Sequence, residues 1–73
     1  MAKLVIQNHI RRLRFDADEM TQKDLAARAG VTRQTIVAIE AAKYAPTLEL
    51  AFQIALVFGK SVDEVFFVEN TPR

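Results

Sequence analysis

The sequence predicts an all-α fold of five short helices in one domain, and three observations indicate it. The chain has 73 residues, which suffice for one small core. Five runs with helical apolar spacing each follow a residue of the helix-capping type, namely Asn8, Thr21, Thr32, Thr47 and Ser61. The only glycines, Gly30 and Gly59, follow such runs, as is typical of residues that end a helix. The predicted helices span residues 8–15, 21–29, 32–42, 47–58 and 61–66.

A β-prone segment lies near each end of the chain, at Lys3–Gln7 and Val65–Val68. The two segments are candidates for a small antiparallel ribbon, whose strands come either from one chain or from two. Asn8 follows the first segment and can cap the first helix, in which Ile10 and Leu13 share one face.

The helix starts differ in their charge. Thr21 is followed at the third position by Asp24, and Ser61 by Glu64, which is the spacing of a capping box. Thr32 has no acid at that position, although a carboxylate there would stabilise the third helix. Because a carboxylate would repel a phosphate, its absence indicates that this helix end approaches an anion.

The fourth helix is apolar on nearly every side, with Glu49 and Gln53 as its only polar residues between positions 48 and 58. The stripe predicted to fill the core consists of Leu48, Ala51, Ala55 and Phe58. The apolar residues left over are Leu50, Phe52, Ile54, Leu56 and Val57. A helix that is apolar all round is buried on more than one side, so we expect a partner to cover it, most simply a second copy.

Charge is unevenly distributed along the chain, although the net charge is only +1. Residues 1–43 carry eight basic and five acidic side chains, which gives +3. Residues 44–73 carry two basic and four acidic ones, which gives −2. An anionic partner would therefore meet the first part of the chain. On charge alone, an ordinary solvated surface remains the alternative.

The second and third helices are joined by a tight turn with the spacing of a helix-turn-helix. Ala26 is small where the third helix crosses, and Gly30 can adopt the left-handed conformation that such a turn needs. The other residues expected to bury the inside of the elbow are Leu25, Ala29, Val31, Ile36 and Ile39.

The stretch TQKDLAARAGVTRQTIVAIE resembles the lambda-repressor-like (XRE, Cro-type) DNA-binding family, and YAPTLELAFQIALVFGKSVDEVF is similar to that family's fourth and fifth helices. The resemblance covers nearly the whole chain. It implies a five-helix lambda-repressor-like fold, with residues 1–73 as one DNA-binding and dimerisation domain and the helix-turn-helix at about 21–42. It also implies a homodimeric regulator that binds double-stranded DNA, most simply a repressor of a palindromic operator.

The resemblance places the third helix in the major groove, with its first side chains on base edges. Arg33 then suits guanine and Gln34 suits adenine, each worth ~1–3 kcal/mol of discrimination. Thr35 reaches a base or a phosphate, and Val37 and Ala38 can touch a thymine methyl. The residues implied to contact phosphates are Gln22, Thr32, Lys43 and Tyr44.

Two further sets of residues have expected structural roles. Arg14 and Glu40 match positions that pair in this family, so we expect a partly buried salt bridge between the first and third helices. The residues expected at the dimer interface are Phe52, Leu56, Phe66 and Phe67.

The sequence departs from the family at two places. The family commonly has Asn or Gly near Ala41 and Ala42, where the chain leaves the third helix with positive φ. Alanine would cost roughly 1 kcal/mol in that conformation, so we predict that the helix continues a residue or two toward Lys43. The loop FDADEM also looks one residue longer than usual, so the first helix is expected to sit slightly differently.

Several features are missing from the sequence. Without cysteine there is no disulfide and no cysteine-ligated metal, which fits a reducing cytoplasm. With no long apolar run and no signal-peptide layout, we expect a cytoplasmic protein that does not span a membrane. His9 stands alone, so we expect a surface residue and no metal site. Nothing resembles a nucleophile with its base or a phosphate-cradling loop, so we expect neither an enzyme nor a cofactor.

Other functions remain open at this point. The apolar surface of the fourth helix could bind a different protein, as an antitoxin binds a toxin. The chain could also be a helical bundle that does not bind DNA. Among DNA-binding functions, activation through contact with RNA polymerase remains an alternative to repression.

Overall fold

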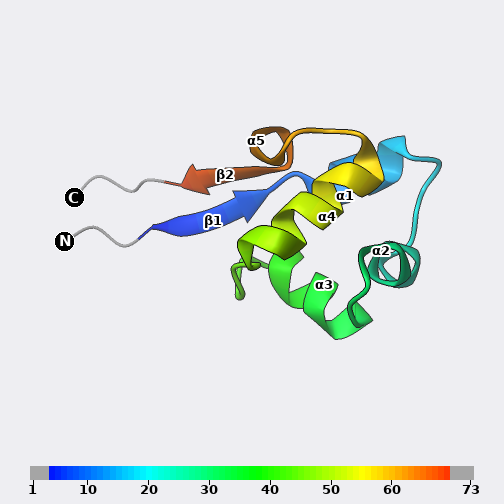
Figure 1. Cartoon of the computed structure of the whole chain (residues 1–73), viewed down its shortest axis with the longest axis horizontal. Coiled ribbons are helices and arrows are strands. Elements are labelled where there is room, and N and C mark those ends of the chain that lie inside the picture. The colour runs from blue at the N-terminus through cyan, green and yellow to red at the C-terminus, as the bar shows by residue number, and fades with distance from the viewer. Residues whose placement is uncertain (1–3, 70–73) are drawn as a thin grey trace.

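The computed structural model describes residues 4–69 as five helices and a two-stranded antiparallel sheet (Figure 1). The elements are β1 (Val5–Asn8), α1 (Ile10–Asp16), α2 (Gln22–Ala29), α3 (Arg33–Glu40), α4 (Leu48–Phe58), α5 (Val62–Val65) and β2 (Phe66–Glu69). This order confirms the predicted lambda-repressor-like fold, including its small β-ribbon. Lys3, the first residue of the predicted β-segment, lies outside the described residues.

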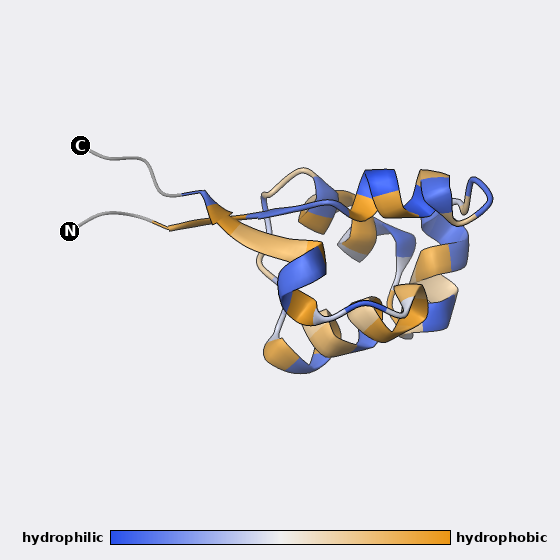
Figure 2. Ribbon diagram, turned by 90° about the horizontal axis from the view of Figure 1, so that it is seen from above, coloured by the Kyte–Doolittle hydropathy of each residue, from blue (hydrophilic) through white to orange (hydrophobic). Residues whose placement is uncertain are grey.

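The β-ribbon pairs β1 and β2 of the same chain and projects from one end of the helical bundle (Figure 1 and Figure 2). Asn8 lies opposite Phe66, and Gln7 lies opposite Phe67. Because successive side chains point to opposite faces of a sheet, Phe66 and Phe67 face in opposite directions. Phe66 is buried in the core of its own chain, so the expectation that it belongs to a dimer interface is wrong.

Asn8 connects the ribbon to α1. The helix begins at Ile10 and not at residue 8, because Asn8 is the last residue of β1. The side chain still binds the helix start, since Asn8 Oδ1 accepts a hydrogen bond from the amide of Ile10 (3.1 Å). Its Nδ2 donates to the carbonyl oxygen of Ile39 (2.9 Å), which ties the ribbon to the last turn of α3.

The core lies between the five helices and the base of the ribbon. Every residue predicted to bury the inside of the elbow does so, except that Val31 is partly buried and packs against the core. The largest fully buried side chains come from six positions in five elements, which are Ile10, Leu25, Ile36, Ile39, Ile54 and Val65.

α4 buries a different face from the predicted one. Its buried residues are Leu50, Ala51, Ile54 and Ala55. Leu48, predicted for the core, is 71% exposed, and Phe58 is only half-buried. The two faces share Ala51 and Ala55. Because α4 carries apolar side chains on nearly every side, the spacing of these residues does not indicate which face is buried. The exposed apolar residues, one turn apart along the helix, form what we call the α4 stripe, which consists of Leu48, Phe52 and Leu56.

The helices α2, α3 and α4 end in the same way. A residue with positive φ follows each of them, namely Gly30 after α2 (77°), Ala42 after α3 (60°) and Gly59 after α4 (65°). In each case the next amide donates to the carbonyl oxygen five residues before it, which is the Schellman arrangement. Glycine adopts this conformation without steric cost, whereas alanine does not.

The end of α3 therefore differs from the prediction that this helix would continue toward Lys43. The helix stops at Glu40, and Ala42 adopts the left-handed conformation in spite of its side chain. Two hydrogen bonds hold the turn, from the amide of Ala42 to the oxygen of Ile39 (2.9 Å) and from the amide of Lys43 to the oxygen of Ala38 (3.0 Å). These bonds satisfy carbonyl groups that a helix end otherwise leaves without partners.

The loop between α1 and α2 contains two more left-handed residues in succession, Asp18 (φ 63°) and Glu19 (φ 57°). The amide of Met20 then donates to the carbonyl oxygen of Arg14 (2.9 Å). The length of the FDADEM segment is accommodated in this way by a tight turn directly after α1.

Candidate nucleic-acid interface

The elbow between α2 and α3 is built from two side-chain caps and one glycine. Thr21 Oγ1 accepts a hydrogen bond from the amide of Asp24 (2.9 Å), and Thr32 Oγ1 accepts one from the amide of Thr35 (3.2 Å). Gly30 turns the chain between the two helices with its positive φ. Both predicted caps are thus confirmed, and the first turn of α3 contains no acidic residue.

α3 has one buried and one exposed face, and it packs beside α2 (Figure 1). Ile36 and Ile39 anchor it, with almost no exposed surface. Arg33, Gln34 and Val37 lie on the outer face and are exposed. The helix is therefore fixed to the core while three side chains from its first half and middle remain free to contact a partner.

A partly buried ion pair joins α1 to the end of α3. Arg14 Nε lies 2.7 Å from Glu40 Oε2, and Arg14 Nη2 lies 3.1 Å from Glu40 Oε1. The third guanidinium nitrogen of Arg14 donates to the carbonyl oxygen of Met20 (2.9 Å). Gln22 Nε2 also donates to Glu40 Oε1 (3.3 Å). One carboxylate thus orients side chains from α1 and from the first residue of α2.

A surface hollow of about 490 Å³ opens beside this ion pair. We call it the basic hollow, and its lining residues are Arg11, Arg14, Thr21, Gln22, Lys23, Arg33 and Glu40. These residues include four cationic side chains and one carboxylate. α1, the start of α2 and the start of α3 meet there, so the predicted base reader Arg33 and the predicted phosphate contact Gln22 share one site.

Arg11 and Lys23 belong to this hollow, although no motif in the sequence indicates a role for either of them. Arg11 precedes Arg14 by three residues, so helical geometry places both on one side of α1. Lys23 directly follows Gln22 at the start of α2. This spacing was available in the sequence, but the convergence of three helices on one hollow was not.

A family model described as helix-turn-helix matches residues 10–65 of the chain. The chain belongs to the helix-turn-helix family. A protein of Methanocaldococcus jannaschii named as an HTH-type transcriptional regulator is 53% identical over 51 residues, which cover 70% of this chain and 77% of that protein. One of Archaeoglobus fulgidus is 48% identical over 51 residues, with 70% and 72% covered. One of Bacillus subtilis is 42% identical over 50 residues, with 68% and 76% covered.

Two consequences follow from membership of the helix-turn-helix family. Its members are transcriptional regulators with a DNA-binding domain and are not enzymes. The matched residues begin at the start of α1 and end with α5, so both strands of the ribbon lie outside the family model.

The remaining predicted contact residues of the helix-turn-helix lie around α3. Thr32 precedes its first residue, and Lys43 and Tyr44 follow its end, all three exposed. Thr35 is half-buried, and its hydroxyl lies 3.0 Å from the hydroxyl of Thr32, so part of its hydrogen-bonding capacity is already used. Ala38 is half-buried as well.

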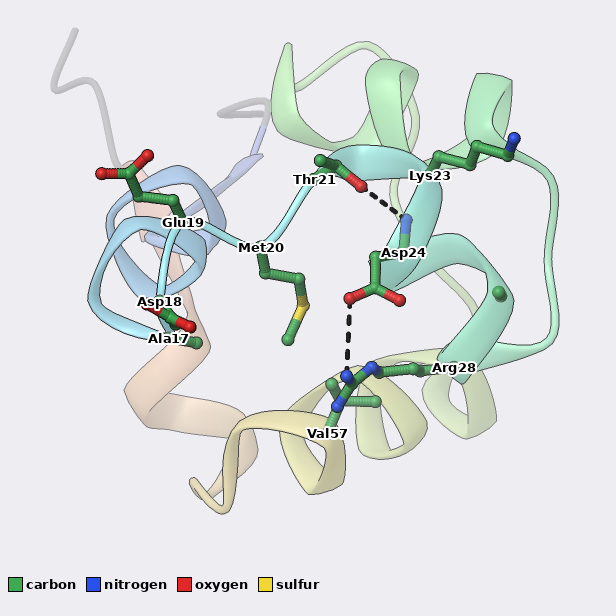
Figure 3. A pocket seen from close by; sticks show the side chains of 10 residues that line it. Ala17, Asp18, Glu19, Met20, Thr21, Lys23, Asp24, Arg28 and Val57 are labelled. Carbon is green, nitrogen blue, oxygen red and sulfur yellow. Dashed lines mark hydrogen bonds and ion pairs between the residues drawn. The ribbon is translucent and has the colours of Figure 1, made fainter.

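A second hollow, of about 700 Å³, is lined by the loop after α1, by α2 and by Val57 of α4 (Figure 3). Its lining includes three carboxylates but only two cations, and we call it the acidic hollow. The lining residues are Ala17, Asp18, Glu19, Met20, Thr21, Lys23, Asp24, Ala27, Arg28 and Val57. Asp24 pairs with Arg28 (3.4 Å), whereas Lys23 extends away from this pair (Figure 3). The excess of carboxylates makes this hollow a poor site for a phosphate.

His9 stacks on Phe67, with ring centroids 4.6 Å apart, on the outer face of the ribbon. Within residues 4–69, no three His, Cys, Asp or Glu side chains are grouped so that they could hold a metal ion. In the same part of the chain no helix has the length and apolar character needed to cross a membrane.

Proposed function

We propose that this helix-turn-helix protein is a homodimeric, sequence-specific regulator that binds a palindromic operator in double-stranded DNA. Residues 1–73 act as one domain for DNA binding and dimerisation. Repression follows from occupation of promoter DNA in the cytoplasm. The observation that carries the proposal is the outer face of α3, which presents polar side chains beside a basic hollow while its inner face is locked into the core.

Base reading is assigned to the first half and middle of α3. Arg33 and Gln34 are exposed next to each other, and their side chains suit guanine and adenine edges in the major groove. Val37 is 42% exposed one turn after Arg33, which favours contact with a thymine methyl. Thr35 and Ala38 flank this face and have a smaller share in the contact. The residues assigned to phosphates are Gln22, Thr32, Lys43 and Tyr44.

The α4 stripe supports the homodimer. Leu48, Phe52 and Leu56 are 71%, 52% and 76% exposed, and they follow one another at intervals of four residues. Apolar surface grouped in this way is typical of an interaction site. An isologous dimer uses the same patch on both copies, so one stripe can cover the other. Phe67 of the ribbon, which is 43% exposed, is also assigned to the proposed interface.

Selection of bound duplexes from a random pool tests the proposal. We expect a palindrome whose half-sites lie about one helical turn (~34 Å) apart and contain G and A at the positions read by α3. Gln34→Ala should relax the preference at one position of each half-site. Selected sequences without two-fold symmetry, or an unchanged preference in the Gln34→Ala variant, would contradict the corresponding part of the proposal.

A further inference from the structure

The two faces of the β-ribbon carry different side chains. On the outer face, Gln7 Nε2 donates a hydrogen bond to Glu69 Oε1 (2.6 Å), so these two polar side chains satisfy each other. Phe67 lies opposite Gln7 on the same face and stacks on His9. The outer face thus carries the charged side chain of the ribbon, and its aromatic ring already has a partner within the chain.

The inner face of the ribbon is apolar apart from Asn8. Asn8 lies opposite Phe66, and Ile6 lies opposite Val68, so these four side chains share one face. Exposure rises along it, from Phe66 in the core (8%) through the partly buried Ile6 to Val68 (48%). Leu4, next in the alternation, is 60% exposed. An apolar face that begins in the core therefore continues past the helices, and we call Leu4, Ile6 and Val68 the ribbon tip.

The ribbon tip and the start of the α4 stripe lie at the same end of the bundle. Figure 1 shows the ribbon projecting from the end at which α3 finishes and α4 starts. The hydrogen bond from Asn8 to the carbonyl oxygen of Ile39 holds the base of the ribbon to the last turn of α3. Leu48, the first residue of α4, opens the stripe and is 71% exposed. A second copy placed at this end can therefore reach both apolar surfaces.

The α4 stripe alone is too small for a stable dimer. Even an aromatic side chain removes only about 150–250 Å² from water when it is fully buried. The three side chains of the stripe are between 52% and 76% exposed, so together they offer roughly half of the ~800 Å² that each partner buries in a standard interface. The ribbon tip offers further apolar surface that is neither assigned to DNA nor stacked within the chain.

We propose that, in the homodimer, the ribbon tip of each copy packs on the α4 stripe of the other. The inference rests on the proposed function and specifies its interface, since the ribbon then contributes through the face opposite to Phe67. Because an isologous interface repeats every contact, both tips and both stripes are covered. A two-stranded ribbon is marginally stable by itself and gains stability from packing against a helix, which the second copy supplies.

Two valines on opposite faces of the ribbon provide a matched pair of variants. Val68 lies on the inner face and Val5, opposite Glu69, on the outer one. Val68→Lys should raise the dissociation constant of the dimer by about tenfold or more, since a two-fold interface loses the contact twice. Val5→Lys should leave the constant nearly unchanged. Sedimentation at several protein concentrations measures both constants, and thermal unfolding verifies that each variant is folded.

The results separate the inference from the proposed function. A Val68→Lys dimer as tight as wild type would overturn the inference, as would equal weakening by Val5→Lys. In either case the homodimer itself stands. A wild-type protein that stays monomeric would instead refute the homodimer of the proposed function.

A single introduced thiol reports whether the ribbon tip is covered, because the chain contains no cysteine. Under reducing conditions, the reactivity of Val68→Cys toward a thiol reagent should fall as the protein concentration rises through the dissociation constant of the dimer. Val5→Cys should stay equally reactive throughout. If Val68→Cys remains reactive in the dimer, the inference is wrong and the face is open to a different protein. Protection that appears only when operator duplex is added would assign the face to DNA and overturn the inference as well.

Discussion

At the scale of single residues, the least expected feature is the backbone of Ala42. Local propensity argues against a left-handed alanine, and the sequence therefore predicted a longer α3. The chain nevertheless ends α3 in the same way as the two helices that are followed by glycine. The caps of α2, α3, α4 and α5, by contrast, were predictable, because each depends on residues three positions apart. Where tertiary structure decides the path of the chain, local preference is overridden.

The Ala42→Gly variant should be more stable than wild type. Glycine removes the steric cost of positive φ but adds freedom to the unfolded chain, so the net gain should be about 0.5–1 kcal/mol. Urea denaturation measures this difference. Ala41→Gly is the matched control, because Ala41 has a φ of −82° and glycine there should only destabilise. A loss of stability in both variants would contradict the strain at Ala42.

The ion pair of Arg14 and Glu40 predicts a second change in stability. In the Glu40→Gln variant the Arg14 guanidinium, whose side chain is 16% exposed, keeps its position without a countercharge. We expect a loss of about 1–3 kcal/mol in the free energy of unfolding. Arg12→Gln removes an exposed pair on the same helix and should change the stability by less than about 0.5 kcal/mol. Equal losses of stability for Glu40→Gln and Arg12→Gln in thermal or urea unfolding would show that the partly buried pair stabilises the fold no more than the exposed pair does.

At the scale of elements, the sequence predicted each helix but not which face of α4 is buried. The caps and glycines define helix ends locally, so the predicted boundaries of α2, α4 and α5 agree with the structure within one residue. Because α4 carries apolar side chains on nearly every side, the sequence allowed either of two faces to be the buried one. In the structure α4 packs against α2 and buries the face that contains Leu50 and Ile54. The basic hollow could not be predicted from the sequence either, because it forms only where α1, α2 and α3 meet in the folded structure.

The start of α5 should respond to pH. The amide of Ser61 donates to Glu64 Oε1 (2.8 Å), and this bond, together with one from the Ser61 hydroxyl, lowers the pKa of the Glu64 carboxyl below its ordinary value. A lowered folded-state pKa means that the stabilising contribution is present above the unfolded pKa and is lost as pH falls through the folded one. In an NMR titration, the Glu64 carboxyl should therefore titrate below its ordinary value, and Ser61→Ala should raise its pKa because the hydroxyl bond is lost. A Glu64 carboxyl with the ordinary pKa in the folded protein would contradict the capping box.

At the scale of the whole molecule, the surfaces divide into two groups. The basic hollow and the outer face of α3 are polar, whereas the α4 stripe and the outer residues of the ribbon are apolar. This division follows the charge asymmetry of the sequence. Phe66 does not fit the sequence-based expectation, because its alternation with Phe67 in β2 places it in the core.

Association of two copies can be tested on the α4 stripe. Leu56→Lys places a charge on the most exposed residue of the stripe, so the variant should be monomeric at micromolar concentration and should bind the operator more weakly than wild type. Gln53→Lys, on the same helix and also exposed, is the control and should remain dimeric. Analytical ultracentrifugation distinguishes the two. A wild-type monomer would instead leave the stripe available for a different protein, such as the toxin partner of an antitoxin.

The β-ribbon has a consequence for the order of folding. Gln7 and Glu69, whose side chains are hydrogen-bonded, are separated by 62 positions, so pairing β1 with β2 closes a long loop. The elbow of α2 and α3 needs only neighbouring residues and can form without that closure. Because loop closure costs entropy before its contacts stabilise anything, the helix-turn-helix should form before the ribbon and survive its transient opening. We therefore expect the elbow, to which DNA reading is assigned in our proposal, to fold before the two strands pair.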